Sequence, residues 1–212
     1  MTKFVNFPSI GYLETKVPDH LFQKMVDGVY LNQKRNNVTP KDSIAGHIEE
    51  TYNLSLDEKD FNEVEDFVLD QCQKYVDEYD IFRFMKFLPS TIVPLELKSI
   101  WSVFQKKHEY NPVHNHAGVF SFVIWVKIPY NLEDEYKHES VSKSCYKVGS
   151  LFSFHYTNSL GRVEDHLIEV DKSYEGTMIL FPAELAHGVY PFFTSDETRI
   201  SIAGNVGLAS YD

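Results

Sequence analysis

The amino-acid sequence predicts a mainly β protein with helices in its N-terminal part. Beyond residue 79, short runs rich in Ile, Val, Phe, Tyr and Trp alternate with Pro, Gly, Asn and Asp, which is typical of a β-sandwich or barrel. Aromatic residues make up 15% of the chain, and they suit sheets. Because 212 residues support one sizeable core but not two, we expect a single domain, helical over residues 1–80 and β over residues 81–212.

The N-terminal third contains two stretches with apolar residues at helical spacing. The first follows Asp19, which we expect to cap a helix, and comprises Leu21, Phe22, Met25, Val26, Val29 and Tyr30. The second follows a capping-box pattern of Ser55 and Glu58, and comprises Phe61, Val64, Phe67, Val68, Cys72, Tyr75 and Val76. The acidic side of this second helix is expected to face solvent. The helices could pack against the sheet or form a homodimer contact.

Eight runs after the helices are predicted as strands because they are rich in β-branched and aromatic residues and end at turn-forming residues. They cover residues 81–87, 95–105, 119–129, 150–156, 164–170, 176–181, 188–192 and 199–205. Between the third and fourth runs, residues 131–147 are polar and charged, and we expect a surface loop there.

The charge and the cysteine content exclude several classes of protein. A formal net charge of −11 argues against general binding of nucleic acid or of anionic membranes, which needs clustered Lys and Arg. No run reaches the roughly 18 apolar residues of a membrane span, and nothing resembles a signal peptide. Cys72 and Cys145 match no zinc spacing, which indicates two free thiols in a reducing compartment. We therefore expect a cytoplasmic protein.

Two histidines, His114 and His116, stand directly before the apolar run at residues 119–129. Residues i and i+2 of an extended chain point to the same side, so both imidazoles can reach one ion. Such pairs also occur by chance on surfaces. Further along, His187 is the polar residue within an apolar run that follows Pro182, where it could be a buried core residue or a third ligand.

Arg199 and Ser201 lie on one face of the last predicted strand. Arginine forms two parallel charge-assisted bonds to a carboxylate, and serine can add a third, so this face could bind a carboxylate. The alternative is an outward Arg199 paired with an acidic neighbour such as Glu197. The order of the groups is a His-x-His pair, a long insertion, a further His, and an Arg-x-Ser pair twelve residues later.

This order resembles that of the 2-oxoglutarate- and iron(II)-dependent oxygenases. More narrowly, it is similar to the prolyl-hydroxylase-like branch that includes uncharacterised proteins of tailed phages and marine bacteria, which implies a bacterial or phage-infected cell. The resemblance covers about half of the chain, roughly residues 101–206. It rests on His114-Asn115-His116 before the strand Phe120-Ser121-Phe122-Val123, on Phe181-Pro182 before His187, and on Arg199-Ile200-Ser201 with Asn205 behind it.

The resemblance implies a double-stranded β-helix core, a cupin-like jelly-roll of two facing antiparallel sheets. It implies that Fe(II) is held by His114, His116 and His187, and that 2-oxoglutarate is held by Arg199 with help from Ser201. Tyr110 and Gln105 lie just before the histidine pair in the sequence, and from that position they could also contact the cosubstrate. The implied reaction consumes dioxygen and hydroxylates an unactivated C–H bond of a prolyl, peptidyl or small-molecule substrate.

One departure from the family pattern concerns the metal ligands. The usual triad has Asp or Glu two residues after the first histidine, where this chain has His116. Imidazole suits iron, although zinc becomes a competitor, and Glu184 is the nearest alternative carboxylate. Two other readings are a jelly-roll binding module without catalysis, and a three-histidine metalloenzyme that does not use 2-oxoglutarate.

Overall fold

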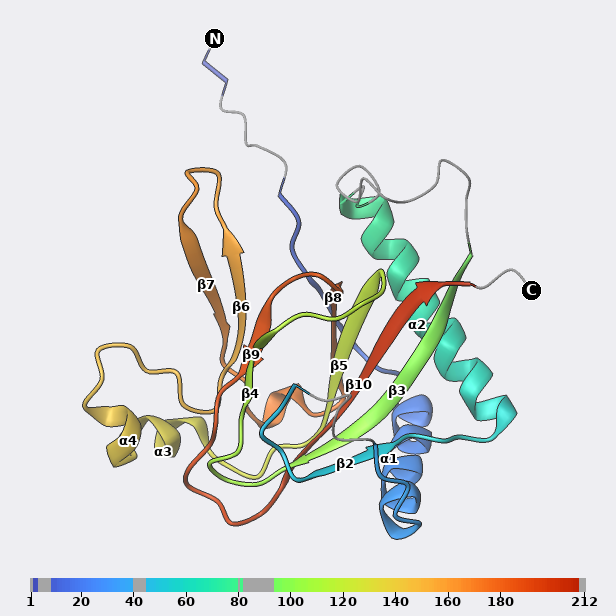
Figure 1. Ribbon diagram of the computed structural model, residues 1–212, viewed down its shortest axis with the longest axis horizontal. Coiled ribbons are helices and arrows are strands. Elements are labelled where there is room, and N and C mark those ends of the chain that lie inside the picture. The colour runs from blue at the N-terminus through green and yellow to red at the C-terminus, as the bar shows by residue number, and fades with distance from the viewer. Residues whose placement is uncertain (1, 4–8, 40–44, 80, 82–93, 210–212) are drawn as a thin grey trace.

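The computed structural model describes residues 2–3, 9–39, 45–79, 81 and 94–209, and its described part contains two antiparallel sheets (Figure 1). The larger sheet has the strand order β1-β8-β5-β10-β3-β2, with bounds β1 Leu13–Lys16, β8 Thr177–Pro182, β5 Phe120–Lys127, β10 Arg199–Leu208, β3 Leu95–Gln105 and β2 Glu50–Asn53. The smaller sheet has the order β4-β9-β6-β7, with bounds β4 Asn111–His114, β9 His187–Val189, β6 Phe152–Thr157 and β7 Val163–Ile168. The predicted jelly-roll core is confirmed.

Two long helices cover one face of the larger sheet. Helices α1 (Asp19–Lys34) and α2 (Glu58–Tyr79) contribute apolar side chains to a core that they share with β3, β5 and β10. The predicted helices therefore exist, but their caps differ. Pro18 precedes α1 and Asp19 is its first residue. At α2, the Asp57 carboxylate accepts a hydrogen bond from the backbone N–H of Asp60 at 2.9 Å, while the Ser55 hydroxyl accepts one from Asn37.

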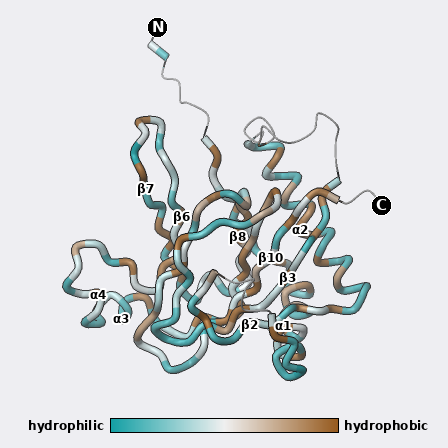
Figure 2. The backbone as a smooth tube through the Cα atoms, viewed as in Figure 1, coloured by the Kyte–Doolittle hydropathy of each residue, from teal (hydrophilic) through white to brown (hydrophobic). Residues whose placement is uncertain are grey.

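The two-residue period of the strands separates the helix side of the larger sheet from the side that faces the smaller sheet. In β10, Ile200 and Ile202 join the core under the helices, whereas Arg199 and Ser201 face the space between the sheets. A second core fills part of that space and combines Trp125 with aromatic residues of β6 and β8. The tube is largely brown at β8 and largely teal around the insertion that follows β5 (Figure 2).

Several short elements differ from the sequence-based expectations. The run at 95–105 is β3 with the predicted bounds, but β1, β2 and β4 were not predicted. Residues 131–147 are not a plain loop, because α3 (Leu132–Lys137) and α4 (Glu139–Ser142) form there, followed further on by a short 3-10 helix, η3 (Lys172–Tyr174). The predicted strand at 81–87 lies outside the described residues except for residue 81. None of the described helices combines the length and the apolar character that crossing a membrane requires.

Candidate active site

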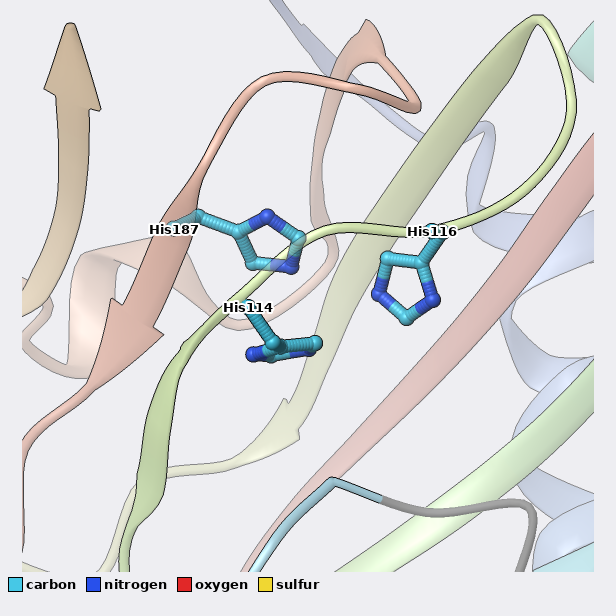
Figure 3. Close-up of side chains that lie close together, drawn as sticks. All are labelled: His114, His116 and His187. Atoms are coloured by element: carbon cyan, nitrogen blue, oxygen red, sulfur yellow. The ribbon is translucent and has the colours of Figure 1, made fainter.

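Three histidine rings converge between the two sheets (Figure 3). One ring nitrogen from each of His114, His116 and His187 lies within 4.8 Å of those from the other two. The ring centroids of His114 and His187 are 4.4 Å apart. Among the described residues, no carboxylate joins this group, and Glu184 is exposed. The three side chains together can offer three imidazole nitrogens to one divalent ion.

Backbone pairing between two segments brings these histidines together. His114 ends β4 and stands directly opposite His187 in the antiparallel register with β9. The backbone N–H of His116 donates to the carbonyl of Ala183 at 2.8 Å, which ties the loop after β4 to the turn before His187. Because β4 and β9 are hydrogen-bonded strands, the sheet fixes the positions of His114 and His187, and the contact to Ala183 fixes the loop that carries His116.

The hydrogen bonds of the rings leave their outer nitrogens available. Nδ1 of His114 donates to the carbonyl of Pro112 at 2.7 Å, and Nδ1 of His187 donates to the carbonyl of Leu185 at 2.9 Å. A proton on Nδ1 leaves the Nε2 lone pair free to bind a metal, and such carbonyl contacts also fix the ring orientation. At His114, Nε2 accepts a 3.4 Å hydrogen bond from the amide nitrogen of Asn111, which a bound metal would replace.

Burial keeps the three imidazoles neutral. It lowers the pKa of His187 to about 3, with the nearby His114 as the second cause, and lowers the pKa of His116 to about 4. It also lowers the pKa of His114. Since a protonated imidazole cannot bind a metal, these shifts keep the site ready for a cation at neutral pH.

A buried cation faces the same cavity. Arg199 is 3% exposed, and its guanidinium donates to Oε1 of Gln105 through Nε at 3.2 Å and through Nη2 at 2.6 Å. Nη1 donates to the Tyr130 hydroxyl and to the Ser150 carbonyl, both at 2.8 Å, and Nη2 also donates to the Tyr190 carbonyl at 3.0 Å. All of these acceptors are neutral groups.

Most of the predicted site residues line one cavity. It measures about 610 Å³ including its open mouth, and its walls include the three histidines together with Gln105, Asn111, Arg199, Ser201, Trp101 and Trp125. Tyr110 is not among the lining residues: it is 39% exposed, pairs with His47 through a short backbone bridge and stacks on its ring with centroids 4.9 Å apart. The outward alternative for Arg199 is wrong, since Glu197 pairs with Lys127 instead.

Four residues that the sequence did not single out for this role complete the surroundings of Arg199 and the cavity wall. Tyr130 and Ser150 flank the insertion of α3 and α4, and both meet the same guanidinium nitrogen, Nη1. Trp101 and Trp125 also line the cavity, and Trp125, which is 3% exposed, belongs at the same time to the core between the sheets. Contacts between segments so distant in the chain leave no periodic signal in the sequence.

Comparison with known proteins places this geometry in a family. A family model described as "Putative 2OG-Fe(II) oxygenase" matches residues 99–205, which are 107 of the 212 residues. No curated protein matches the chain. Among solved structures, a prolyl-4-hydroxylase of Pseudomonas putida is similar with a TM-score of 0.58 at 13% identity, over 95% of both chains. AviO1 of Streptomyces viridochromogenes Tue57 is similar with a TM-score of 0.54 at 10% identity, over 96% of this chain and 92% of its own.

At these identities the structural likeness shows the fold alone, and the family match carries the assignment. The match begins within β3, ends within β10 and includes all three histidines and Arg199. The chain therefore belongs to the 2OG-Fe(II) oxygenases, enzymes whose cofactors are Fe(II) and 2-oxoglutarate.

Proposed function

We propose that His114, His116 and His187 bind Fe(II), that Arg199 and Ser201 bind the distal carboxylate of 2-oxoglutarate, and that the enzyme hydroxylates an unactivated C–H bond of a prolyl or peptidyl substrate. The observation that carries the proposal is the shared cavity, in which three neutral imidazoles and one buried guanidinium meet.

The donor set fits iron. Imidazole is a suitable ligand for Fe(II), and the Nδ1 contacts to backbone carbonyls direct the Nε2 lone pairs of His114 and His187 to the metal, which would replace the Asn111 amide at His114. A site with three neutral ligands adds no negative charge of its own, so the ion would retain its full double charge. That positive charge favours an anionic ligand in addition to the three histidines, and a 2-oxo acid supplies one.

The state of Arg199 supports a carboxylate as its further partner. Among the residues that the structure describes, no carboxylate forms an ion pair with this guanidinium, although it is almost fully buried. Moving a charge out of water is costly unless an opposite charge compensates. A bound dicarboxylate would supply that charge, and the Ser201 hydroxyl on the same strand face would add a hydrogen bond.

The residues of the chain position the reactants and exclude water. When bound, iron together with 2-oxoglutarate and dioxygen supplies the oxidising power for C–H hydroxylation, with succinate and carbon dioxide as products. The aromatic walls formed by Trp101, Trp125 and Phe152 shield the cavity from bulk water, and the three histidines would hold the ion. The likeness of the fold to the Pseudomonas putida prolyl-4-hydroxylase supports the choice of a prolyl substrate.

The test is an anaerobic titration of the metal-free protein with Fe(II) and 2-oxoglutarate, recording the weak visible charge-transfer band of the iron chelate. We expect a band that requires both additions. His187→Ala should lose metal binding, whereas His20→Ala, which changes an exposed histidine on α1, should not. Bound metal without a band would refute the cosubstrate site and leave a three-histidine metalloenzyme. An absence of metal binding would refute the proposed ligands.

The substrate class is tested separately, in air, by following succinate. Proline-containing peptides should raise the conversion of 2-oxoglutarate to succinate above the rate without substrate, and mass spectrometry should find a gain of one oxygen atom in the peptide. Peptides in which alanine replaces every proline are the matched control. Equal rates with both sets would contradict a prolyl substrate while leaving the cofactor sites intact.

A further inference from the structure

We propose that Gln105 is an exchangeable partner of Arg199, which the distal carboxylate of 2-oxoglutarate must displace, so that this side chain sets the affinity and the selectivity of the cosubstrate site. The inference rests on the proposed function and adds a specificity-determining role for a residue that sits beside the guanidinium rather than beside the metal.

The first observation is that the guanidinium has no donor to spare. Arginine carries five N–H groups, and the five hydrogen bonds of Arg199 go to four groups of the chain. One oxygen, Oε1 of Gln105, accepts from both Nε and Nη2. These two nitrogens form the fork to which a carboxylate binds with two parallel bonds. The Gln105 amide therefore occupies one of the places where the cosubstrate carboxylate would pair.

The second observation identifies Gln105 as the partner that gives way. Gln105 lines the cavity, whereas Tyr130, Ser150 and Tyr190 are not among the lining residues. The Ser150 and Tyr190 acceptors are backbone carbonyls, which cannot leave without moving the chain. The Tyr130 hydroxyl is buried and also donates to the Ser150 carbonyl. A carboxylate that enters from the cavity thus meets the amide of Gln105 first.

The third observation is that Gln105 can move its oxygen and keep its other bond. Its amide nitrogen donates to the carbonyl of Glu109 at 2.5 Å, across the turn that follows β3. Rotation of the amide about this contact would withdraw Oε1 from Arg199 without releasing the side chain. The Gln105 amide thus contacts Arg199 through its oxygen and the Glu109 carbonyl through its nitrogen.

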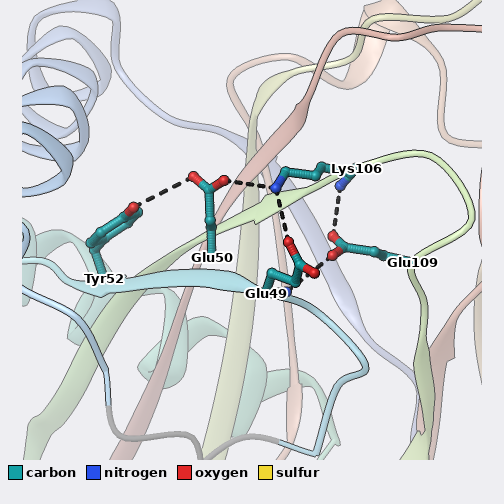
Figure 4. Close-up of polar contacts among 5 residues, drawn as sticks. All are labelled: Glu49, Glu50, Tyr52, Lys106 and Glu109. Carbon is teal, nitrogen blue, oxygen red and sulfur yellow. Dashed lines mark hydrogen bonds and ion pairs between the residues drawn. The ribbon is translucent and has the colours of Figure 1, made fainter.

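A network of charges holds that turn in place (Figure 4). The Glu109 carboxylate accepts from the backbone N–H of Lys106 at 2.8 Å and from the backbone N–H of Glu49 at 3.1 Å. The Lys106 ammonium lies 3.0 Å from Glu49 and 2.9 Å from Glu50. Since these contacts join the turn to β2, the anchor of Gln105 stays fixed while its amide changes partner.

Exchange has a measurable consequence for affinity. A charged acceptor makes stronger hydrogen bonds to a guanidinium than a neutral amide does, so a carboxylate wins the competition, but the lost amide bonds reduce its net gain. Gln105→Ala removes the competitor and should tighten 2-oxoglutarate binding by about fivefold to tenfold. Gln105→Glu places a permanent carboxylate on the Nε and Nη2 donors of Arg199, and it should weaken 2-oxoglutarate binding by more than about tenfold. Pyruvate, a 2-oxo acid without the distal carboxylate, should bind equally to all three proteins.

The experiment measures dissociation constants on the Fe(II)-loaded, anaerobic full chain by intrinsic fluorescence, because both tryptophans line this cavity. Titrations with 2-oxoglutarate and with pyruvate are run on the wild type, Gln105→Ala and Gln105→Glu, together with metal affinity and thermal unfolding. Opposite shifts of the two variants for 2-oxoglutarate, with unchanged pyruvate and metal affinity, are the expected result.

One other outcome overturns the inference, and a different one refutes the function on which it rests. Weaker 2-oxoglutarate binding in Gln105→Ala, with retained binding in Gln105→Glu, would mean that Gln105 only positions Arg199. If Gln105→Ala does not fold, the Glu variant decides alone, because a positioning role predicts retained affinity and an exchange role predicts its loss. A wild type that binds no 2-oxoglutarate would instead refute the proposed function itself.

Discussion

Glu135 is the side chain whose removal should be most damaging outside the cavity. It lies on α3, is 0% exposed, and accepts hydrogen bonds from the backbone N–H groups of Phe193 and Thr194 and from the Thr194 hydroxyl. The segment that it holds connects β9, which carries His187, to β10, which begins with Arg199.

Glu135→Ala leaves two backbone donors and one hydroxyl without their acceptor in a buried place. A hydrogen bond to a charged group contributes about 1.5–3 kcal/mol, and relief from burying the carboxylate offsets part of the loss of three bonds. We therefore expect a loss of about 3 kcal/mol in the free energy of unfolding, or a fall of about 6–12 °C in Tm for a chain of this size. Glu135→Gln keeps one acceptor oxygen, so its free energy of unfolding should lie between those of the wild type and Glu135→Ala.

The assay is chemical and thermal unfolding followed by circular dichroism, with Glu133→Ala as the matched control. Glu133 stands on the same short helix, its side chain is 85% exposed, and its contact to Lys137 is a surface ion pair of 3.7 Å. Such a pair contributes little, so the control should stay within about 0.5 kcal/mol of the wild type. Equal stability of Glu135→Ala and Glu133→Ala would refute the reasoning.

Two further predictions concern a glycine and the cysteines. Gly118 has φ +118°, and an added Cβ would lie 2.8 Å from the carbonyl oxygen of Val206, so Gly118→Ala should cost about 2–4 kcal/mol and weaken metal binding through the neighbouring histidine loop. Gly161→Ala is the control, because Gly161 has φ +77° and an added Cβ would have nothing within 4 Å, so only backbone strain should cost stability, about 1 kcal/mol. Equal losses of unfolding free energy for the two variants in urea titrations would rule out the clash with Val206. Burial raises the pKa of the Cys72 thiol to about 12, so at pH 8 the folded protein should present one reactive thiol, the exposed Cys145, to a colorimetric thiol reagent, and two after denaturation. Raising the pH to 9 should not expose Cys72 to the reagent while the chain stays folded, and a fast second thiol there would contradict its buried position.

The sequence predicted long elements better than short ones because long elements repeat their pattern. The run at 95–105 has eleven residues rich in β-formers and forms β3 with the predicted bounds, and helix α2 repeats its apolar face over several turns. Strands β1, β2 and β4 have four residues each, too few to establish a period. Pro112 within β4 also argued against a strand there, although its place at the sheet edge tolerates a missing donor.

Spacing along the chain predicted only the pairs within the site, whereas the link from these pairs to His187 came from the family resemblance. His114 and His116 share an extended segment, and Arg199 and Ser201 share a strand face, so their spacing alone suggested a joint role. The partners of Arg199 come from four separate segments, and their meeting follows from the register of the strands and from the path of the insertion. Tyr110 is close in sequence to the histidines, but its ring stacks on His47 and is not among the residues that line the cavity.

The division of the site between the two sheets has a consequence for the life of the enzyme. His114 and His187 belong to the smaller sheet, whereas Arg199 belongs to the larger one. A cosubstrate bound to the ion at one end and to Arg199 at the other would connect the two sheets. It would stabilise the folded chain more as the cosubstrate concentration rises. A shortage of 2-oxoglutarate would then lower the stability of the enzyme as well as its rate. The chain would unfold more readily and proteases would degrade it faster. The supply of cosubstrate would therefore govern the amount of enzyme in addition to its activity.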